Sequence, residues 1–185
     1  MSTNYRNYIG TERHYDVGAM LQFNLATLLG LREHHKFLDI GCGSLRLGRL
    51  LIPYLLPENY YGIEPNFWQV KEGIDNEVSN QLIEIKKANI TEDRFFNLST
   101  WDTKFDFVWA FGIFTHATQD QINKCFDEFV KCSHENTMMV ANFVEGDSDS
   151  GQDEWSYPGF AKYRFDFFKN LAEDRGLNCV MIDYP

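Results

Sequence analysis

The sequence predicts an α/β fold in which helices flank a doubly wound, mainly parallel β-sheet. Apolar runs of strand length alternate with segments of helical periodicity along the whole chain. No repeat, low-complexity tract or Pro/Gly-rich linker divides the 185 residues, of which 44% are apolar. We therefore expect one domain with one core, because a chain of this length buries enough surface without disulfides or metal.

The first half of the chain predicts three helices and three strands. Residues 18–29 carry apolar side chains largely on one helical face, among them Met20 and Leu28, and Gly30 provides a C-terminal stop. Pro53 is expected to kink or end the second helix, and Asn66 to cap the third. After the first helix, the predicted order is strand 36–40, helix 44–55, strand 60–64, helix 66–79 and strand 82–87.

The second half continues the alternation of strand and helix after a long loop at residues 88–104, whose aromatic residues suggest that part of it packs. Cys125 and Cys132 are seven residues apart in a helical pattern, which is the spacing of one buried face. The predicted elements are strand 105–111, helix 118–132, strand 137–144, helix 159–175 and strand 178–183.

Composition excludes several classes of function. The chain has 17 Lys and Arg against 27 Asp and Glu, a net charge of −10, so binding to a nucleic-acid backbone is not expected. The polar N-terminus and the absence of a run of ~20 apolar residues predict a cytoplasmic protein without a membrane partner. The four cysteines have no metal-binding spacing, so we expect reduced thiols and no metal site.

Residues 37–48, FLDIGCGSLRLG, hold the most informative motif. Asp39 ends a predicted strand, and Gly41 and Gly43 allow a sharp turn and close approach of a ligand before a helix begins. Glu64 closes the next strand 23 residues after Gly41, where a carboxylate can accept hydrogen bonds from both hydroxyls of a ribose. The sequence therefore predicts a nucleoside site.

Two classes of ligand use this layout, and the presence or absence of a third glycine separates them. A dinucleotide site requires a third glycine at position 46, where this chain has Arg46. The anion of Asp39 would repel a pyrophosphate but suits a cationic amino group. A sulfonium-bearing cofactor is therefore favoured, and an NAD-dependent oxidoreductase is the weaker alternative.

The motifs LQF, LDIGCGSLR, IPYL, YYGIE and FDFVWAFGIFTHAT make the chain resemble the class I S-adenosylmethionine-dependent methyltransferases. Within them it looks like the bacterial type with LDIGCGSLR, and the resemblance covers residues 15–184. It implies a leading helical cap at 1–35 and a Rossmann-like core at 36–185. The core is expected to be C-terminally short and without the family's usual seventh, antiparallel strand, because only Tyr184 and Pro185 follow strand 178–183. A right-handed crossover through helix 159–175 then predicts six parallel strands in the order 3-2-1-4-5-6.

The resemblance also implies roles for individual residues. The methionine part of the cofactor would be held by the loop from Asp39 to Gly43. Arg46 either pairs with the cofactor carboxylate or bonds a neighbouring loop, and Gln22 either reaches the cofactor or lies on a helix surface. The other implied cofactor contacts are Gly41 and Cys42 in the loop, Glu64 at the ribose, Asn89 and Ile90 at the adenine, and Phe111 and Gly112 beside the reacting methyl.

His116, in the segment FTHAT, is a candidate base that takes a proton from the acceptor, or a histidine that only shapes its loop. The acidic run 145–154 fails the pattern of an EF-hand, because Gly151 and Gln152 stand where an oxygen ligand and a glycine are required. Trp155, Tyr157 and Phe160 either line an acceptor pocket or anchor the next helix.

The expected function is methyl transfer from S-adenosylmethionine, by in-line displacement, to a small-molecule or glycan-precursor acceptor. The alternative to an enzyme is a non-catalytic module that keeps the fold and acts through partners. A homodimer through the C-terminal sheet edge is a further expectation, because an open edge exposes unpaired backbone groups.

Overall fold

The computed structural model describes residues 5–8 and 12–184. The chain divides into two compact units, a first unit that ends at Arg94 and a second unit, Phe95–Tyr184. Residues 1–4 and 9–11 of the predicted cap lie outside the described residues. The prediction of a single domain with a cap at 1–35 stays a prediction.

The first unit contains three parallel strands. β1 and β2 pair along their full length, and all their residues are buried, as expected for strands covered on both faces. Gly41 and Glu64 therefore each follow directly after a fully buried strand. The strands are β1 (Phe37–Ile40), β2 (Tyr60–Ile63) and β3 (Asn89–Thr91).

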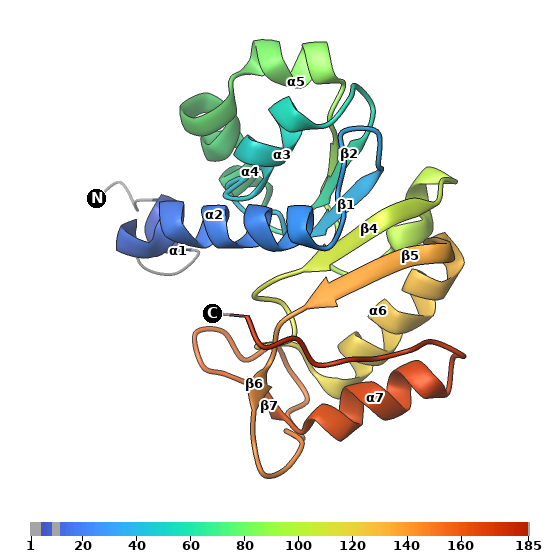
Figure 1. The fold of residues 1–185 in the computed structure, drawn as a ribbon. Helices are drawn as coiled ribbons and strands as arrows, with labels where there is room; N and C mark the ends of the chain where they lie inside the picture. Colours follow the sequence, from blue (N-terminus) through green and yellow to red (C-terminus); the bar gives the residue numbers. More distant parts are fainter. Residues whose placement is uncertain (1–4, 9–11, 185) are drawn as a thin grey trace. The chain divides into compact units, whose positions relative to one another are not determined.

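The helices of the first unit gather around β1 and β2, and Figure 1 shows α3, α4 and α5 together on one side of these strands. Helix α1 contacts α4, and α2 contacts α3. The helices are α1 (Tyr5–Tyr8), α2 (Glu12–Leu28), α3 (Gly48–Tyr54), α4 (Phe67–Gly73), the π-helix η1 (Ile74–Val78) and α5 (Asn80–Lys86).

Helix α2 begins six residues earlier than predicted, and its buried face agrees only in part with the apolar face of residues 18–29. Leu25 is buried as expected, whereas Met20 and Leu28, also expected inside, are 57% and 76% exposed. The buried residues are Tyr15, Ala19, Gln22, Leu25 and Ala26. Small alanines let the helix backbone approach the rest of the unit closely, and this favours a face that apolar periodicity alone does not select.

The third predicted strand, residues 82–87, is wrong: this segment is helix α5. The Ser79 side chain caps it by accepting a hydrogen bond from the Leu82 N–H at 3.3 Å, and Lys87 ends it in the left-handed region. A short apolar run does not distinguish strand from helix. Strand β3 lies further on, inside the predicted loop 88–104, so Asn89 and Ile90 belong to the strand rather than follow it.

The helix after the glycine loop starts later than predicted, at Gly48 instead of position 44. Leu45 has a φ of +59°, which is incompatible with an α-helix. Pro53 lies in the last turn of α3, which ends at Tyr54 as expected. Asn66 makes no side-chain cap on α4, so that prediction is wrong.

The second unit contains a parallel pair of strands and two longer helices. Helix α6 packs against β5 and α7, and it buries Cys125 and Cys132 as predicted. Thr118 starts α6 with a capping box. The elements are η2 (a 3₁₀ helix, Leu98–Trp101), β4 (Phe105–Ala110), α6 (Gln119–Cys132), β5 (Ser133–Ala141), β6 (Val144–Glu145), β7 (Lys162–Tyr163) and α7 (Phe165–Glu173).

The strand order of the main sheet is β3-β2-β1-β4-β5, and β6 and β7 form a separate parallel pair. The predicted fold class, a Rossmann-like α/β sheet flanked by helices, is confirmed, with five strands in place of six. The helix predicted at 159–175 is shorter because residues 162–163 belong to β7.

The predicted sixth strand, residues 178–183, is not formed. Val180, Met181 and Ile182 are 77%, 50% and 44% exposed. Strand propensity is realised only where a neighbouring backbone completes the ladder, so local sequence does not decide it. The expectation of dimerisation through this edge stays a prediction.

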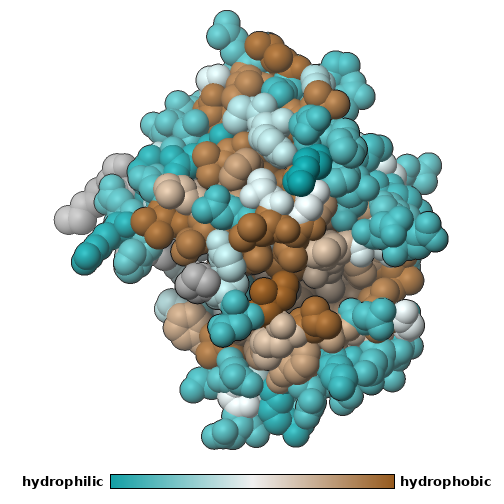
Figure 2. All heavy atoms as spheres, viewed as in Figure 1, coloured by the Kyte–Doolittle hydropathy of each residue, from teal (hydrophilic) through white to brown (hydrophobic). Residues whose placement is uncertain are grey.

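Figure 2 shows, for one face, hydrophobic residues gathered in patches, with hydrophilic residues over the rest of the surface. Among the described helices, none combines the length and the apolar character needed to cross a bilayer.

Candidate functional site

The loop between β1 and α3 turns sharply over the end of β2. Gly41 and Gly43 have φ values of +69° and +54°, in the region that glycine enters at little cost. The N–H groups of Gly41 and Cys42 donate to the Ile63 carbonyl at 2.8 and 3.1 Å. The glycine motif is therefore joined through its backbone to the strand that Glu64 follows.

The carboxylate of Glu64 is almost completely buried and binds this loop directly. Its Oε2 accepts from the Gly43 N–H at 3.0 Å, and its Oε1 accepts from the Asn66 N–H at 2.8 Å. Burial raises the pKa of Glu64, while the two backbone N–H groups oppose the increase. Each carboxylate oxygen keeps a free lone pair, so the side chain can still accept hydrogen bonds from a ligand.

Asp39, one residue before the end of β1, is a second buried carboxyl group. The Tyr60 hydroxyl donates to its Oδ2 at 3.0 Å, and Oδ1 has no hydrogen-bond donor among the described residues. Burial raises the pKa of Asp39 to about 7, although the Tyr60 hydrogen bond and the charge of Arg46 oppose the shift. A cation that approached Oδ1 would favour the ionised carboxylate.

Tyr60 was not predicted as a site residue, although the sequence contains the signal. Side chains two residues apart on a strand point to the same face, so Tyr60, Gly62 and Glu64 share one face of the strand YYGIE. Gly62 leaves the space that the Cys42 thiol occupies, because a Cβ there would lie 3.0 Å from Cys42 Sγ. Burial raises the pKa of Cys42 well above its usual value, so the thiol stays protonated.

The side chains of Arg46 and Gln22 both lie next to Gly18 of helix α2. The Gln22 side chain is 4% exposed, and its Nε2 donates to the Gly18 carbonyl at 3.2 Å. The Arg46 guanidinium lies against Gly18, with Nη1 3.6 Å from the position a Cβ would take. Gln22 is therefore buried beside the turn that faces Arg46, and the surface location considered for it is wrong.

Asn89 and Ile90 lie within β3, opposite Tyr61 and Gly62. The Asn89 side chain donates to the Lys87 carbonyl at 3.2 Å. Its amide oxygen is thus left to accept a hydrogen bond, as the predicted contact with adenine requires. That contact stays a prediction.

In the second unit, Phe111 and Gly112 follow β4 in a turn. The Gly112 N–H donates to Asn142 Oδ1 at 2.6 Å. Gly112 has a φ of +78°, and a Cβ at this position would meet no atom within 4 Å. Asn142, which follows β5, was not predicted. The Asn142 side chain thus fixes the turn at Gly112, which has open space beside it.

His116 lies in the same connection and is held by the segment that carries the exposed aromatic residues. Its Nδ1 is 2.7 Å from the Gly159 carbonyl, which can only accept, so Nδ1 carries the proton and the neutral ring leaves Nε2 as a base. Phe160 stacks on the ring at a centroid distance of 5.4 Å, and Trp155 and Tyr157 lie at 5.6 and 5.3 Å. The three aromatic residues therefore surround His116.

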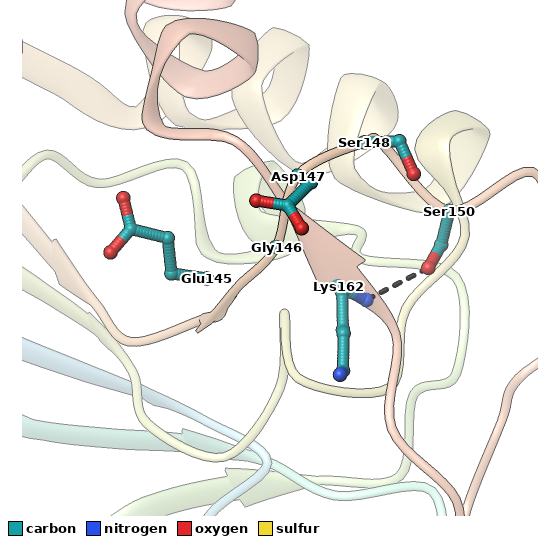
Figure 3. Close-up of a pocket in the computed structure, with 6 residues that line it drawn as sticks. All are labelled: Glu145, Gly146, Asp147, Ser148, Ser150 and Lys162. Carbon is teal, nitrogen blue, oxygen red and sulfur yellow. Dashed lines mark hydrogen bonds between the residues drawn. The ribbon is translucent and has the colours of Figure 1, made fainter.

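A hollow of about 620 Å³ lies in the second unit and contains none of the predicted site residues (Figure 3). Figure 3 shows the carboxylates of Glu145 and Asp147 and the ammonium of Lys162, with the Lys162 N–H bound to Ser150 Oγ. No group of three His, Cys, Asp or Glu side chains in the described part of the chain could hold a metal ion. We therefore place the candidate site at the ends of the strands and not in this hollow.

The family model of a methyltransferase domain matches residues 38–141, more than half of the 185 residues. The chain belongs to this family of methyltransferase domains, which transfer a methyl group from S-adenosylmethionine. The predicted class is thereby confirmed, whereas the bacterial type with LDIGCGSLR stays a prediction. No curated protein sequence matches the chain.

Solved structures with similar folds include a protein from Pyrococcus horikoshii, with 16% identity, a TM-score of 0.62 and coverage of 91% of this chain and 84% of that one. The magnesium protoporphyrin IX methyltransferase of Synechocystis with bound SAH has 11% identity, a TM-score of 0.64 and coverage of 93% and 80%. An S-adenosylmethionine-dependent methyltransferase from Clostridium acetobutylicum has 12% identity, a TM-score of 0.59 and coverage of 86% of this chain and 79% of that one. At these identities the likeness shows the fold alone.

The residues of the first unit fit S-adenosylmethionine. Its amino group and ribose hydroxyls require hydrogen-bond acceptors, and Asp39 Oδ1 has no hydrogen-bond donor among the described residues. Two side-chain atoms of this unit are buried without a partner: the acceptor Gln69 Oε1 on α4 and the donor Arg49 Nε on α3. Buried polar atoms are rarely left unpaired, so a ligand with donors suits this surface.

Proposed function

We propose that this protein transfers a methyl group from S-adenosylmethionine to a small-molecule acceptor or glycan precursor, with Asp39 and Glu64 as the main cofactor-binding side chains. The observation that carries the proposal is the pair of hydrogen bonds that join Glu64 to Gly43 and Asn66. This bonding orients a buried carboxylate beside the glycine loop before any ligand arrives. A preformed acceptor of this kind lowers the cost of ordering the site on binding.

Each proposed contact uses a group whose geometry supports it. Asp39 Oδ1 accepts from the amino group, and Glu64 accepts from the ribose hydroxyls. Arg46, held against α2, pairs with the carboxylate of the cofactor, and Gln22 supports it from the helix. The remaining proposed contacts are the backbone of Gly41, Cys42 and Gly43 at the methionyl part, Asn89 and Ile90 at the adenine, and Phe111 and Gly112 near the methyl group.

The bound cofactor supplies a methyl group on a positively charged sulfur, which leaves as a neutral thioether. His116 is proposed as the base that receives the proton of the acceptor N–H or O–H on Nε2. The Gly159 carbonyl bond to Nδ1 and the three neighbouring rings hold the imidazole in one orientation, with Nε2 left to take the proton. The net charge of −10 favours a neutral or cationic acceptor over an anionic polymer.

Calorimetry with S-adenosylhomocysteine and with NAD tests the proposed cofactor. We expect binding of the first and none of the second; the reverse would support the oxidoreductase alternative. Pools of candidate acceptors incubated with methyl-labelled S-adenosylmethionine then test catalysis. Labelled product that requires His116 supports the proposed enzyme, whereas cofactor binding without label in any pool supports the non-catalytic alternative.

A further inference from the structure

We infer that Tyr15 is a positioning residue for the methionyl end of the cofactor, because its hydroxyl holds Ser44 and thereby sets the shape of loop 43–46. The inference rests on the proposed function, since this loop is the proposed cofactor loop. Tyr15 lies 29 residues before Ser44 in the chain, on helix α2 and outside the glycine motif.

Two buried hydroxyl groups form the contact. Tyr15 is 1% exposed and Ser44 is completely buried. The Tyr15 hydroxyl donates to the Ser44 carbonyl at 3.1 Å, and the Ser44 Oγ lies 3.0 Å from the same hydroxyl oxygen, to which it can donate in return. Burial raises the pKa of Tyr15 to about 12, so the hydroxyl keeps its proton at neutral pH.

The loop has a backbone that needs such support. Leu45, directly after Ser44, has a φ of +59°, a conformation that costs energy for a residue with a side chain. On the side of α4, a Cβ at Gly73 would lie 2.2 Å from the Ser44 carbonyl oxygen, so the helix backbone touches the loop there. Ser44 is therefore held between α2 and α4, next to the Gly43 N–H that binds Glu64.

The Tyr15 ring is held independently of its hydroxyl. The guanidinium groups of Arg6 and Arg49 lie 4.7 and 5.3 Å from the ring centre. Both arginines also bond the carboxylate of Glu77, Arg6 through Nε at 2.7 Å and Arg49 through Nη1 at 3.3 Å. Removal of the hydroxyl alone should leave the ring in place, so Tyr15→Phe is a clean variant.

The test compares two ligands in wild type, Tyr15→Phe and a matched control. S-adenosylhomocysteine carries the amino-acid end, whereas 5′-methylthioadenosine keeps only the nucleoside. We expect Tyr15→Phe to weaken binding of S-adenosylhomocysteine ~3- to 10-fold and to change that of methylthioadenosine less than ~2-fold, as the loss of one buried hydrogen bond that acts on one end of the ligand predicts. In the control Tyr54→Phe, which removes a bond to the Leu31 carbonyl instead, neither affinity should change.

The outcomes separate this inference from the proposed function. If wild type binds no S-adenosylhomocysteine, the proposed function fails and the inference with it. Suppose instead that wild type binds S-adenosylhomocysteine, and that Tyr15→Phe lowers the affinity for both ligands equally or for neither. The role of Tyr15 is then structural, and the inference is overturned. A melting temperature of Tyr15→Phe measured with each affinity shows whether the variant is folded. Ser44→Ala removes only the partner hydroxyl and keeps the Tyr15 bond to the backbone carbonyl, so it should weaken S-adenosylhomocysteine binding less than Tyr15→Phe does.

Discussion

In the first unit the carboxylates of Asp39 and Glu64 are each 5% exposed and already hydrogen-bonded by the protein, whereas in the second unit Trp155, Tyr157 and Phe160 are 41%, 43% and 65% exposed around His116. Buried acceptors with fixed partners suit one ligand of fixed shape, because little has to be ordered when it binds. Exposed rings on a connecting segment can adjust to different molecules. The proposed cofactor side of the chain is therefore preorganised, whereas the proposed acceptor side is not.

The largest difference between the units is expected from matched glycine substitutions. Gly73→Ala should lower the free energy of unfolding by about 3 kcal/mol or more, because the new Cβ would lie 2.2 Å from the Ser44 carbonyl oxygen. Gly151→Ala in the second unit meets no atom within 4 Å and should change it by less than about 0.5 kcal/mol. Urea denaturation of both variants measures the two changes in the free energy of unfolding. Equal stabilities would contradict the tight packing of the proposed cofactor loop.

The next effect concerns turnover. His116→Ala should lower the rate of methyl transfer about 100-fold or more near neutral pH, with recovery at higher pH as the acceptor loses its proton unaided. Affinity for S-adenosylhomocysteine should stay unchanged. His134→Ala, which removes another exposed histidine of the second unit, is the control. A loss that is the same at every pH would make His116 a residue that shapes its loop.

Glu64→Ala should weaken cofactor binding about 30- to 100-fold, because it removes an acceptor for the ligand and leaves the Gly43 and Asn66 N–H groups without their partner. Calorimetry with S-adenosylhomocysteine measures the loss. Glu58→Ala, which removes an exposed glutamate paired with Lys87, should leave the affinity at the wild-type value. Similar affinities in the two variants would remove Glu64 from the site.

The smallest effect is a dependence on pH that comes from Asp39. Its folded-state pKa is raised from 3.8 to about 7, so its contribution to stability is fully present below pH ~4 and is lost as the pH rises through 7. Asp39→Asn should therefore gain roughly 1 to 3 kcal/mol relative to wild type between pH 5 and pH 8 in ligand-free protein. Thermal unfolding at both pH values measures the gain.

The same titration has the opposite consequence for binding. The ionised carboxylate is the form proposed to accept from the cofactor amino group, so wild-type affinity should fall roughly 3- to 10-fold from pH 7.5 to pH 6. Asp39→Asn should bind weakly with little dependence on pH. If wild type and variant showed the same pH profile, Asp39 would not be the titrating group.

Local sequence determined the part of the site that lies within one strand and its following turn. The strand 36–40, the two glycines and the acids at 39 and 64 were all found, because a buried apolar run, glycine turns and strand-end acids act over a few residues. The same local reasoning failed at residues 82–87, where a capped helix replaced the strand, and at 178–183, where no neighbouring backbone completes a ladder.

Only tertiary structure decided how distant residues support this motif. The bonds from Gly43 to Glu64, from Tyr60 to Asp39 and from Tyr15 to Ser44 join residues 21, 21 and 29 positions apart. Whether such groups meet depends on strand register and on which face of α2 is buried, and apolar periodicity had wrongly placed Met20 and Leu28 on that face. The sequence by itself therefore determined the class of cofactor and the acids proposed to bind it. The packing of α2, α4 and β2 around the loop decided how those groups are held, because burial and hydrogen-bond partners are properties of the folded chain.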